Sequence, residues 1–258
     1  MIFIKTKEEI IKMRGASAIV LEVLSLLTRE VAPGVSTWEL DKVAENYTLE
    51  HGATPAFKGY KDFPASVCFA INNEIVHGIP SKDRVLREGD IVSMDFGAVV
   101  DGYYGDSAVT VPVGEVSPDA LRLLEVTRES LYKGIENATT SNRLLDVSKA
   151  IQEHVERAGF SVVTAFVGHG IGRNLHEEPQ VPNFVPSNSN WGRGMRLKSG
   201  MVIAIEPMVN MGGPDVEILD DGWTAITKDG SLSAHFEHTV AITDNGPMVL
   251  TAGASQGN

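Results

Sequence analysis

The sequence contains a single cysteine, Cys68, among 258 residues, so neither a disulfide within the chain nor a cysteine-rich zinc site can form. It lacks any uninterrupted apolar run near the ~18 residues that a membrane-spanning helix needs. The segment MIFIKTKEEIIKMR at the amino terminus is too highly charged for a secretory signal peptide. These absences predict a cytoplasmic protein, with no membrane partner, whose metal ligands would be histidines and carboxylates.

Basic residues are also scarce. There are 22 Lys and Arg against 34 Asp and Glu, which gives a net charge of −12. Because a surface of this sign repels phosphate, we expect no direct nucleic-acid binding. Apolar residues form 43% of the chain and charged residues 22%, which is typical of a globular protein with a full core. No long exposed apolar stripe calls for an obligate partner, so we expect a monomer.

The first part of the chain has two helix signals followed by strand signals. Thr6 and Glu9 have the spacing of a capping box before a helix expected over residues 7–30. The same spacing recurs at the start of a second helix expected over 36–52. The stretch 64–113 that follows is rich in strand-forming residues.

The order of helices and then strands recurs in the second part. Ser117 and Pro118 are typical of a helix start, and the third helix is expected to run to about residue 135. A fourth helix is expected to end at Gly159, and strands and loops follow it.

A ten-residue segment is also repeated without gaps. LREGDIVSMD at 86–95 aligns with LKSGMVIAIE at 197–206. Each copy reads as a turn, an apolar strand and then a carboxylate, which is Asp95 in the first copy and Glu206 in the second. This pattern indicates an internal duplication.

The duplication predicts the architecture. We expect one α+β domain over 1–258, built from two halves at approximately 1–115 and 116–258. If the halves pack face to face across a pseudo-twofold axis, Asp95 and Glu206 come together.

Asp95 and Glu206 are unusual because each interrupts an apolar strand, where an unpaired ionised carboxylate costs several kcal/mol. A buried Arg or Lys partner would be the simplest explanation. However, residues 91–113 contain no basic residue. A bound metal ion is therefore the better hypothesis.

Asp101-Gly102 is a strong signal for a tight hairpin turn. This turn places Asp106 opposite Gly97, on the face that also carries Asp95. The two aspartates are then diagonal neighbours about 7–8 Å apart at the backbone, and Gly97 and Gly105 are expected to leave space between them. Converging carboxylates without a basic neighbour either raise a pKa or bind a cation.

Histidines supply further candidates. Three of them lie in glycine-containing loops beside apolar strands: His77 in VHGIP, and His169 and His176 in GHGIGRNLHEEP. In AHFEHT, His235 shares a strand face with Glu237, whereas His238 points to the other side.

Taken in order, these residues resemble the active site of the type I methionine aminopeptidases, metallopeptidases of the pita-bread fold. The resemblance extends from the first helix to SAHFEHT at 233–239. It implies five metal ligands: Asp95, Asp106, His169, Glu206 and Glu237. It further implies that Asp106 and Glu237 bridge two divalent ions, that His169 and Glu206 complete one ion, and that Asp95 completes the other.

The residues agree with such a centre, because four carboxylates neutralise two divalent cations. One histidine among oxygen ligands favours Mn²⁺, Fe²⁺ or Co²⁺ without excluding Zn²⁺ or Ni²⁺. The resemblance implies catalytic roles for three residues: His77 contacts the scissile amide, His176 donates to the developing oxyanion, and Glu206 shuttles protons. The substrates implied are nascent polypeptides, including those at the ribosome, that carry an amino-terminal methionine before a small second residue.

The resemblance also implies a methionine pocket. Beside His77 and His176, its lining would be Phe57, Tyr60, Phe63, Cys68, Leu175 and Trp223. For each of these six, ordinary core packing is the alternative. Three positions depart from the usual family pattern, namely Val76, Leu175 and His235, and the loop 181–200 looks longer than usual.

Two other functions fit the same motifs. An X-Pro aminopeptidase or prolidase shares the fold and the metal ligands, but such enzymes usually carry a large amino-terminal domain. A catalytically inactive pita-bread module that binds peptides would have lost metal ligands, whereas all five are present.

Overall fold

The computed structural model describes residues 2–186 and 194–252. Within these ranges the four α-helices are α1 (Lys7–Glu30), α2 (Thr37–Glu50), α3 (Pro118–Asn137) and α4 (Leu144–Arg157). Both predicted capping boxes are present, at Thr6 with Glu9 and at Ser36 with Glu39. The four helices expected from the sequence are therefore confirmed.

The helices accompany one large antiparallel sheet. Over the described residues it has nine strands in the order β1-β4-β5-β14-β9-β7-β8, with β2 beside β4 and β15 beside β14. These strands are β1 (Thr54–Pro55), β2 (Val67–Ile71), β4 (Ile91–Val100), β5 (Tyr103–Pro112), β7 (Gly168–Gly170), β8 (Glu177–Val181), β9 (Val202–Ile205), β14 (Glu237–Thr243) and β15 (Gly246–Val249).

Two small sheets and a short helical turn complete the described structure. The small sheets have the orders β13-β10-β6 and β11-β12-β3. Their strands are β3 (Glu74–Val76), β6 (Ser161–Val162), β10 (Met208–Asn210), β11 (Val216–Ile218), β12 (Ala225–Thr227) and β13 (Ser233–His235), and the 3₁₀ turn is η1 (Tyr60–Asp62).

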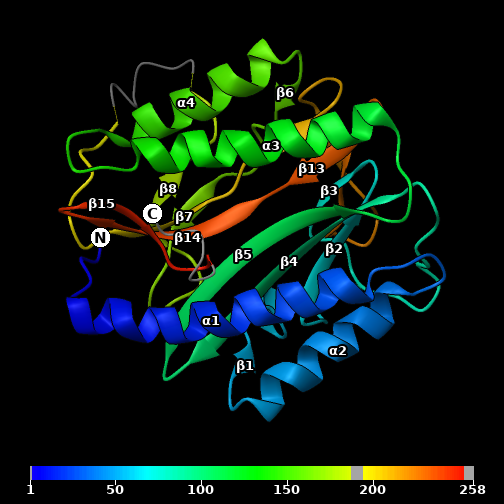
Figure 1. The fold of residues 1–258 in the computed structure, drawn as a ribbon, viewed down its shortest axis with the longest axis horizontal. Coiled ribbons are helices and arrows are strands. Elements are labelled where there is room, and N and C mark those ends of the chain that lie inside the picture. Colours follow the sequence, from blue (N-terminus) through cyan, green and yellow to red (C-terminus); the bar gives the residue numbers. More distant parts are fainter. Residues whose placement is uncertain (1, 187–193, 253–258) are drawn as a thin grey trace.

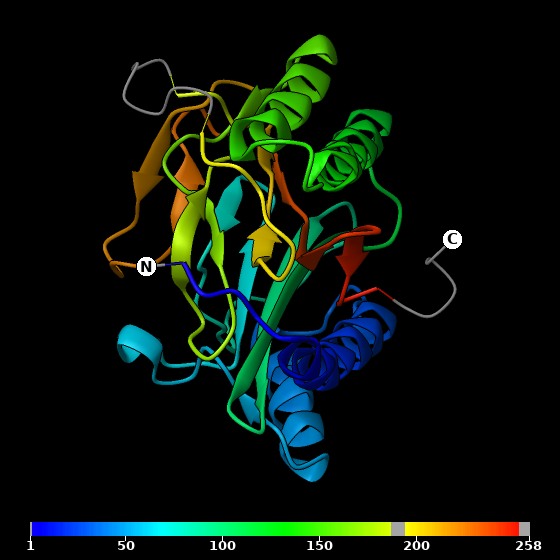
Figure 2. The same cartoon turned by 90° about the vertical axis from the view of Figure 1, so that its left-hand side faces the viewer.

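All four helices lie on one side of the curved large sheet (Figures 1 and 2). Leu27 of α1 and Leu40 of α2 belong to an apolar cluster with Met94 of β4. Leu123 of α3 and Ile203 of β9 belong to a second cluster, under the other half of the sheet. The α+β fold predicted from the sequence is thus confirmed, and the helices leave the opposite face of the sheet for the site.

The two halves meet edge to edge, so the expected face-to-face packing is wrong. Strand β5 of the first half pairs with β14 of the second, through Ala108 with Glu237 and Ser107 with His238. The pairing is reinforced because the Thr239 hydroxyl accepts from the backbone N–H of Asp106, at 3.1 Å, and donates to the carbonyl of the same residue, at 2.7 Å. One continuous curved sheet thereby carries residues from both halves.

The β4–β5 hairpin has the predicted register, with Gly97 opposite Asp106. The expected space beside the glycines is filled. A Cβ on Gly97 would lie 2.9 Å from the Phe57 ring, and one on Gly105 would lie 2.8 Å from the Ser17 backbone of α1. Gly105 therefore permits the close approach of a helix on the face opposite the aspartates, and Phe57 occupies the space at Gly97 on their own face.

Glu206 differs from Asp95 in its setting. Asp95 lies inside β4, but Glu206 follows the last residue of β9, so it does not interrupt a strand. Pro207 comes next and cannot donate to a strand ladder, which ends β9 at this point. The chain then passes into β10 of a small sheet.

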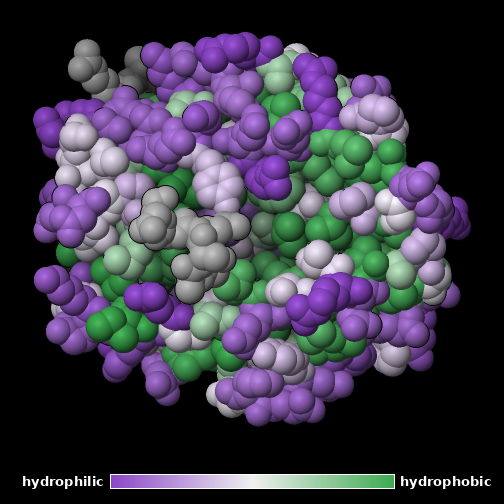
Figure 3. All heavy atoms as spheres, in the orientation of Figure 1, coloured by the Kyte–Doolittle hydropathy of each residue, from purple (hydrophilic) through white to green (hydrophobic). Residues whose placement is uncertain are grey.

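The helix-covered face is polar at its edges and apolar between them (Figure 3). A groove there is lined by residues of α1 and α3, including Leu21, Leu24 and Leu131, together with Phe236. Among the described residues, no helix has the length and apolarity required to cross a membrane.

Candidate metal and peptide site

One cleft gathers every site residue predicted from the sequence. Its lining is Phe57, Tyr60, Lys61, Phe63, Cys68, His77, Asp95, Asp106, His169, Leu175, His176, Glu206, Trp223 and Glu237. The acidic residues come from both halves of the large sheet and from the end of β9. The aromatic residues come from η1 and the loops beside it and before β12.

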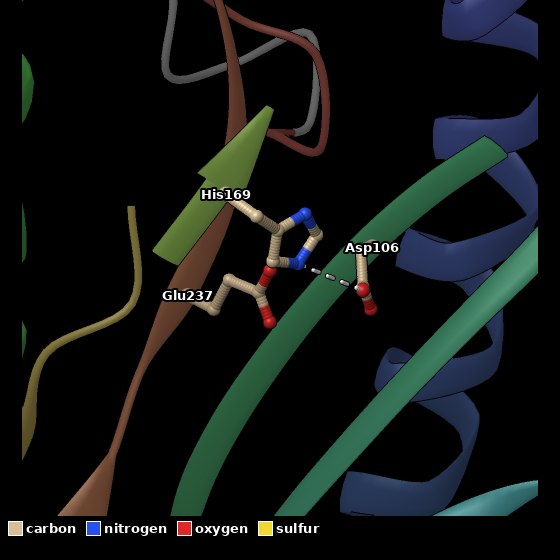
Figure 4. A group of neighbouring side chains, drawn as sticks. All are labelled: Asp106, His169 and Glu237. Atoms are coloured by element: carbon tan, nitrogen blue, oxygen red, sulfur yellow. Dashed lines mark ion pairs between the residues drawn. The ribbon is translucent and has the colours of Figure 1, made fainter. Parts of the chain in front are cut away.

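Asp106, His169 and Glu237 form the centre of the cleft. One potential ligand atom from each lies within 4.8 Å of the others, and all three residues are buried. They project toward one another from β5, β7 and β14 (Figure 4). The closest His169 Nε2 to Asp106 Oδ2 distance is 3.9 Å.

Glu206 and Asp95 extend this group on two sides. Glu206 Oε1 lies 3.6 Å from His169 Nε2. Asp95 lies diagonally across the β4–β5 hairpin from Asp106, the neighbour predicted from the register. The side-chain amide of Asn183 donates to the Glu206 carbonyl at 3.0 Å, which helps to hold the chain where β9 ends.

Four carboxyl groups thus converge, with Asp106 and Glu237 buried and Asp95 and Glu206 half-buried, and their pKa values are raised. Burial raises the pKa of Asp106 to about 7. Burial and the charge of Asp106 raise the pKa of Asp95, of Glu206 and of Glu237 well above the usual range. Without cations, these groups retain protons that ordinary carboxyl groups lose.

The donor set fits divalent metal ions. Asp95 Oδ1, Asp106 Oδ1 and Glu237 Oε1 are buried, and each lacks a hydrogen-bond partner among the described residues. Buried acceptors of this kind are normally satisfied. Four carboxylates and one imidazole around a common point supply both the charge and the ligand atoms that such ions need.

The hydrogen bond of His169 determines which ring nitrogen is free. Its Nδ1 lies 2.9 Å from the carbonyl oxygen of Gly170. A carbonyl only accepts, so Nδ1 carries the proton and donates. Burial lowers the pKa of His169 to about 4, so the ring is neutral. Its Nε2 therefore presents a lone pair toward Asp106 and Glu206, as a metal ligand requires.

His77 lies at the other side of the cleft with an unusual backbone. It follows β3 and has φ 64°, in the left-handed region that residues with a side chain rarely adopt. Its ring packs against Phe166 at 5.3 Å and Trp223 at 6.4 Å between centroids. Burial, followed by the charge of Lys61, lowers the pKa of His77 to about 4.

Arg84 holds the loop that follows His77. Its guanidinium donates to the carbonyl oxygens of Ile79, at 2.5 Å, and Phe69, at 3.3 Å. The same group forms an ion pair with the carboxylate of Glu74. These contacts join the loop after His77 to β2 and β3 and account for the persistence of a strained residue beside the site.

The proposed methionine pocket is apolar with aromatic edges. Phe63 and Trp223 meet edge to face at 5.1 Å between centroids. Cys68 lies opposite Asp95 on the neighbouring strand, and burial raises the pKa of its thiol. Leu175, one of the departures from the family pattern, is fully buried beside them.

Sequence reasoning missed Lys61 and Arg84. Lys61 lines the cleft because the turn around it has left-handed backbone angles at Lys61 and Asp62, with φ 48° and 69°. Lysine does not signal such a turn, and the aspartate after it does not by itself place Lys61 in the left-handed region. The role of Arg84 depends on carbonyl groups from two separate segments, which no local pattern reveals.

The other two positions that depart from the family pattern, Val76 and His235, do not line the cleft. His235 is fully buried, as is Val76. His238 faces the opposite side of the sheet from the site, where it hydrogen-bonds to Thr251, at 2.9 Å. Of the loop 181–200, residues 187–193 lie outside the described residues, so its predicted extra length stays a prediction.

Comparisons with known proteins give one consistent result. The model of metallopeptidase family M24 matches residues 11–244. A methionine aminopeptidase of Clostridium acetobutylicum is 53% identical over 251 residues, covering 97% of this chain and 99% of that protein. The crystal structure of a methionine aminopeptidase from Thermotoga maritima has a TM-score of 0.94 at 46% identity, covering 98% of this chain and 100% of that one.

Prolidases are more distant. The prolidase of Pyrococcus furiosus has a TM-score of 0.78 at 26% identity, and the match covers 97% of this chain but 65% of that one. The two kinds of enzyme therefore share this fold, and the prolidase chain has a further part to which this chain has no match.

Proposed function

This chain belongs to metallopeptidase family M24 and, within it, to the methionine aminopeptidases, and we propose that it removes an amino-terminal methionine when the second residue is small. The observation that carries the proposal is the buried group of four carboxylates and one neutral histidine beside an apolar cleft. Substrates of this kind are nascent polypeptides, at the ribosome or after release. The sequence features favour a cytoplasmic monomer that binds neither membrane nor nucleic acid.

Five residues would hold two divalent ions. Asp106 and Glu237 would be shared between the ions, His169 and Glu206 would serve one, and Asp95 the other. Four negative charges then balance two divalent cations, and the oxygen-rich set suits Mn²⁺, Fe²⁺ or Co²⁺, with Zn²⁺ and Ni²⁺ as alternatives. When bound, such ions lower the pKa of water and supply a nucleophile at neutral pH.

The other polar residues of the cleft would act on the peptide. Glu206 would accept a proton and return it to the leaving amine. His176 would donate a hydrogen bond to the carbonyl oxygen as negative charge develops there. His77, held by the loop after β3, would contact the scissile amide and orient it.

The apolar side of the cleft would select methionine. Phe57, Tyr60 and Phe63 lie on one segment, and Cys68, Leu175 and Trp223 complete the lining. Aromatic edges make favourable contacts with a thioether sulfur, and an unbranched side chain fits an irregular apolar pocket. Tyr60 and His77 would then lie near the second residue and limit its size.

The experiment that tests this function compares two peptides. Purified protein, freed of metal and then supplied with Mn²⁺, Co²⁺, Fe²⁺ or Zn²⁺, is incubated with Met-Ala-Ser and with Ala-Pro-Ala. We expect release of methionine from the first and no cleavage of the second. Cleavage of Ala-Pro-Ala alone would identify an X-Pro peptidase, and metal binding without cleavage of either would identify a binding module.

A further inference from the structure

Three rings adjoin one another along the cleft, with one pair stacked and the other tilted by 42°. His169 and His176 have centroids 4.2 Å apart, and His176 and Tyr60 have centroids 5.2 Å apart with planes 20° from parallel. The rings come from β7, from the residue before β8, and from η1. His176 is therefore held between a candidate metal ligand and a phenol.

The phenol also contacts a defined atom of His176. The Tyr60 hydroxyl oxygen lies 2.9 Å from Nδ1. Each of these two atoms can either donate or accept a hydrogen bond, so at this distance a single proton lies between Nδ1 and the hydroxyl oxygen.

The direction of this hydrogen bond follows from the chemistry of the two groups. An imine nitrogen of imidazole is a better acceptor than a phenol oxygen, and a phenol O–H is a good donor. The favourable arrangement has Tyr60 donating to Nδ1. The ring proton of His176 then resides on Nε2.

We propose that Tyr60 is a positioning residue that fixes His176 as its Nε2–H tautomer and thereby prepares it to donate to the substrate carbonyl. The proposal rests on the proposed function. Tyr60 would then have two roles, because it lines the methionine pocket and also acts through His176.

The two neighbouring histidines then have opposite tautomers for opposite tasks. The carbonyl of Gly170 leaves His169 with a bare Nε2, which is suited to bind a metal. Tyr60 leaves His176 with a protonated Nε2, which is suited to donate. A change of either partner would disturb one role without directly altering the other.

The η1 turn explains how Tyr60 is aimed. The Tyr60 N–H donates to the Phe57 carbonyl and the Phe63 N–H donates to the Tyr60 carbonyl, both at 2.9 Å. Between them, Lys61 and Asp62 adopt left-handed backbone angles. Such strain persists only where surrounding contacts require it, as they do beside functional sites.

The first test reads the tautomer directly in the metal-loaded protein. Protein labelled with ¹⁵N and loaded with diamagnetic Zn²⁺ is examined by long-range ¹H–¹⁵N spectra of the imidazoles, with His176 assigned from the signals lost in His176→Ala. We expect a protonated Nε2 and a hydrogen-bonded, unprotonated Nδ1. A proton on Nδ1 of His176 would overturn the proposal.

The second test removes only the hydroxyl group. Tyr60→Phe retains the ring and its stacking, so the Nδ1 shift is expected to move toward that of an imine without a donor. We expect kcat for Met-Ala-Ser to fall about 3- to 10-fold, the effect of one neutral hydrogen bond, with KM and metal content little changed. The proposal would be contradicted if Tyr60→Phe changed neither the ¹⁵N chemical shift of His176 Nδ1 nor kcat.

A double variant separates this role from pocket lining. If Tyr60 acts through His176, Tyr60→Phe combined with His176→Ala has the kcat of His176→Ala alone. A further loss in the double variant would show that the hydroxyl acts on the peptide itself. The matched control is Tyr47→Phe, which removes a phenol that donates to Glu22 outside the cleft and should change neither readout.

The spectroscopic test needs no substrate, so its outcome is distinct from that of the proposed function. A wild-type protein that releases no methionine would refute the function and leave the tautomer result intact.

Discussion

His169 and His176 lie with their ring centroids 4.2 Å apart, yet their Nδ1 atoms face a carbonyl and a phenol respectively. Neighbouring rings of the same residue type would otherwise be difficult to distinguish by role. Their hydrogen-bond partners make the distinction, and it leads to separate predictions for the two positions.

Replacement of His169 and of His176 by alanine should have different effects. His169→Ala is expected to weaken metal binding, with part of the activity restored by excess metal. His176→Ala should retain its metal but lose ~10²–10³ in kcat, the usual cost of one preorganised donor, with little change in KM. Metal titration by calorimetry beside steady-state kinetics tests both. A His176→Ala protein rescued by excess metal would show that the two roles are reversed.

Asp106→Asn should abolish binding of two metal ions, because a neutral amide bridges two cations poorly. Activity is expected to fall more than ~10²-fold, since metal-activated water supplies the nucleophile at neutral pH. Metal content and kcat are measured at matched metal concentration. The control is Asp101→Asn at the turn of the same hairpin, where asparagine tolerates the left-handed backbone. Full activity of Asp106→Asn would refute its bridging role.

The size of the second residue should control cleavage. Peptides with Gly, Ala, Ser, Thr, Cys, Pro or Val after methionine are expected to be cleaved, because His77 and Tyr60 crowd larger side chains. The measurement is kcat/KM for Met-Ala and Met-Leu peptides that are otherwise identical. Equal values would contradict the crowding argument.

Without metal, the protein should lose stability as pH rises. Burial raises the pKa of Asp106 to about 7, and the pKa values of Asp95, Glu206 and Glu237 are raised in the same direction. The folded chain therefore binds more protons than the unfolded chain above the ordinary carboxyl pKa. The stabilisation is complete below that pKa and is lost as pH increases through the folded value.

Thermal unfolding in a chelator is the corresponding measurement. We expect Tm to fall by roughly 5 °C between pH 7 and pH 9, where the buried histidines are neutral in both the folded and the unfolded chain, and to fall less when Mn²⁺ replaces the protons. Asp106→Asn should make the chelated protein less sensitive to pH. A Tm that rises over this range in the chelated wild type would contradict the direction of these shifts.

Arg84→Met should destabilise the fold by about 1–3 kcal/mol, because it removes the cation paired with Glu74, which keeps only the Ile71 N–H, and the donor to two carbonyl groups. Urea denaturation gives the change in the free energy of unfolding. Adding Glu74→Gln should recover part of the loss, since the unpaired charge is removed. Lys133→Met is the control, because it breaks an exposed pair with Glu136 that contributes little. If Arg84→Met and Lys133→Met lowered the free energy of unfolding equally, the proposed role of Arg84 in holding the loop after His77 would be refuted.

Local patterns in the sequence predicted much of this structure. The capping residues Thr6 and Ser36 give the helix starts, and the turn at Asp101-Gly102 gives the register that places Asp106 near Asp95. These features depend on a few neighbouring residues, whose physics is largely independent of the remainder of the fold.

The features that depend on contacts between distant segments of the chain were predicted less well from the sequence. The edge-to-edge joining of β5 and β14 and the approach of Gly105 to Ser17 are set by packing between segments far apart in the chain. The same holds for Lys61, whose place in the cleft results from a strained turn that its own side chain does not favour.

The seam between the two halves of the sheet, where β5 pairs with β14, also affects how the halves separate. Asp95 and Asp106 lie on one side of it and Glu237 on the other, so bound cations would cross-link the two halves of the sheet. Loss of metal would then weaken the seam, which its backbone pairing and the Thr239 hydrogen bonds to Asp106 still hold together. A chain cut between β5 and α3 could remain assembled while its cations were bound and separate after they left.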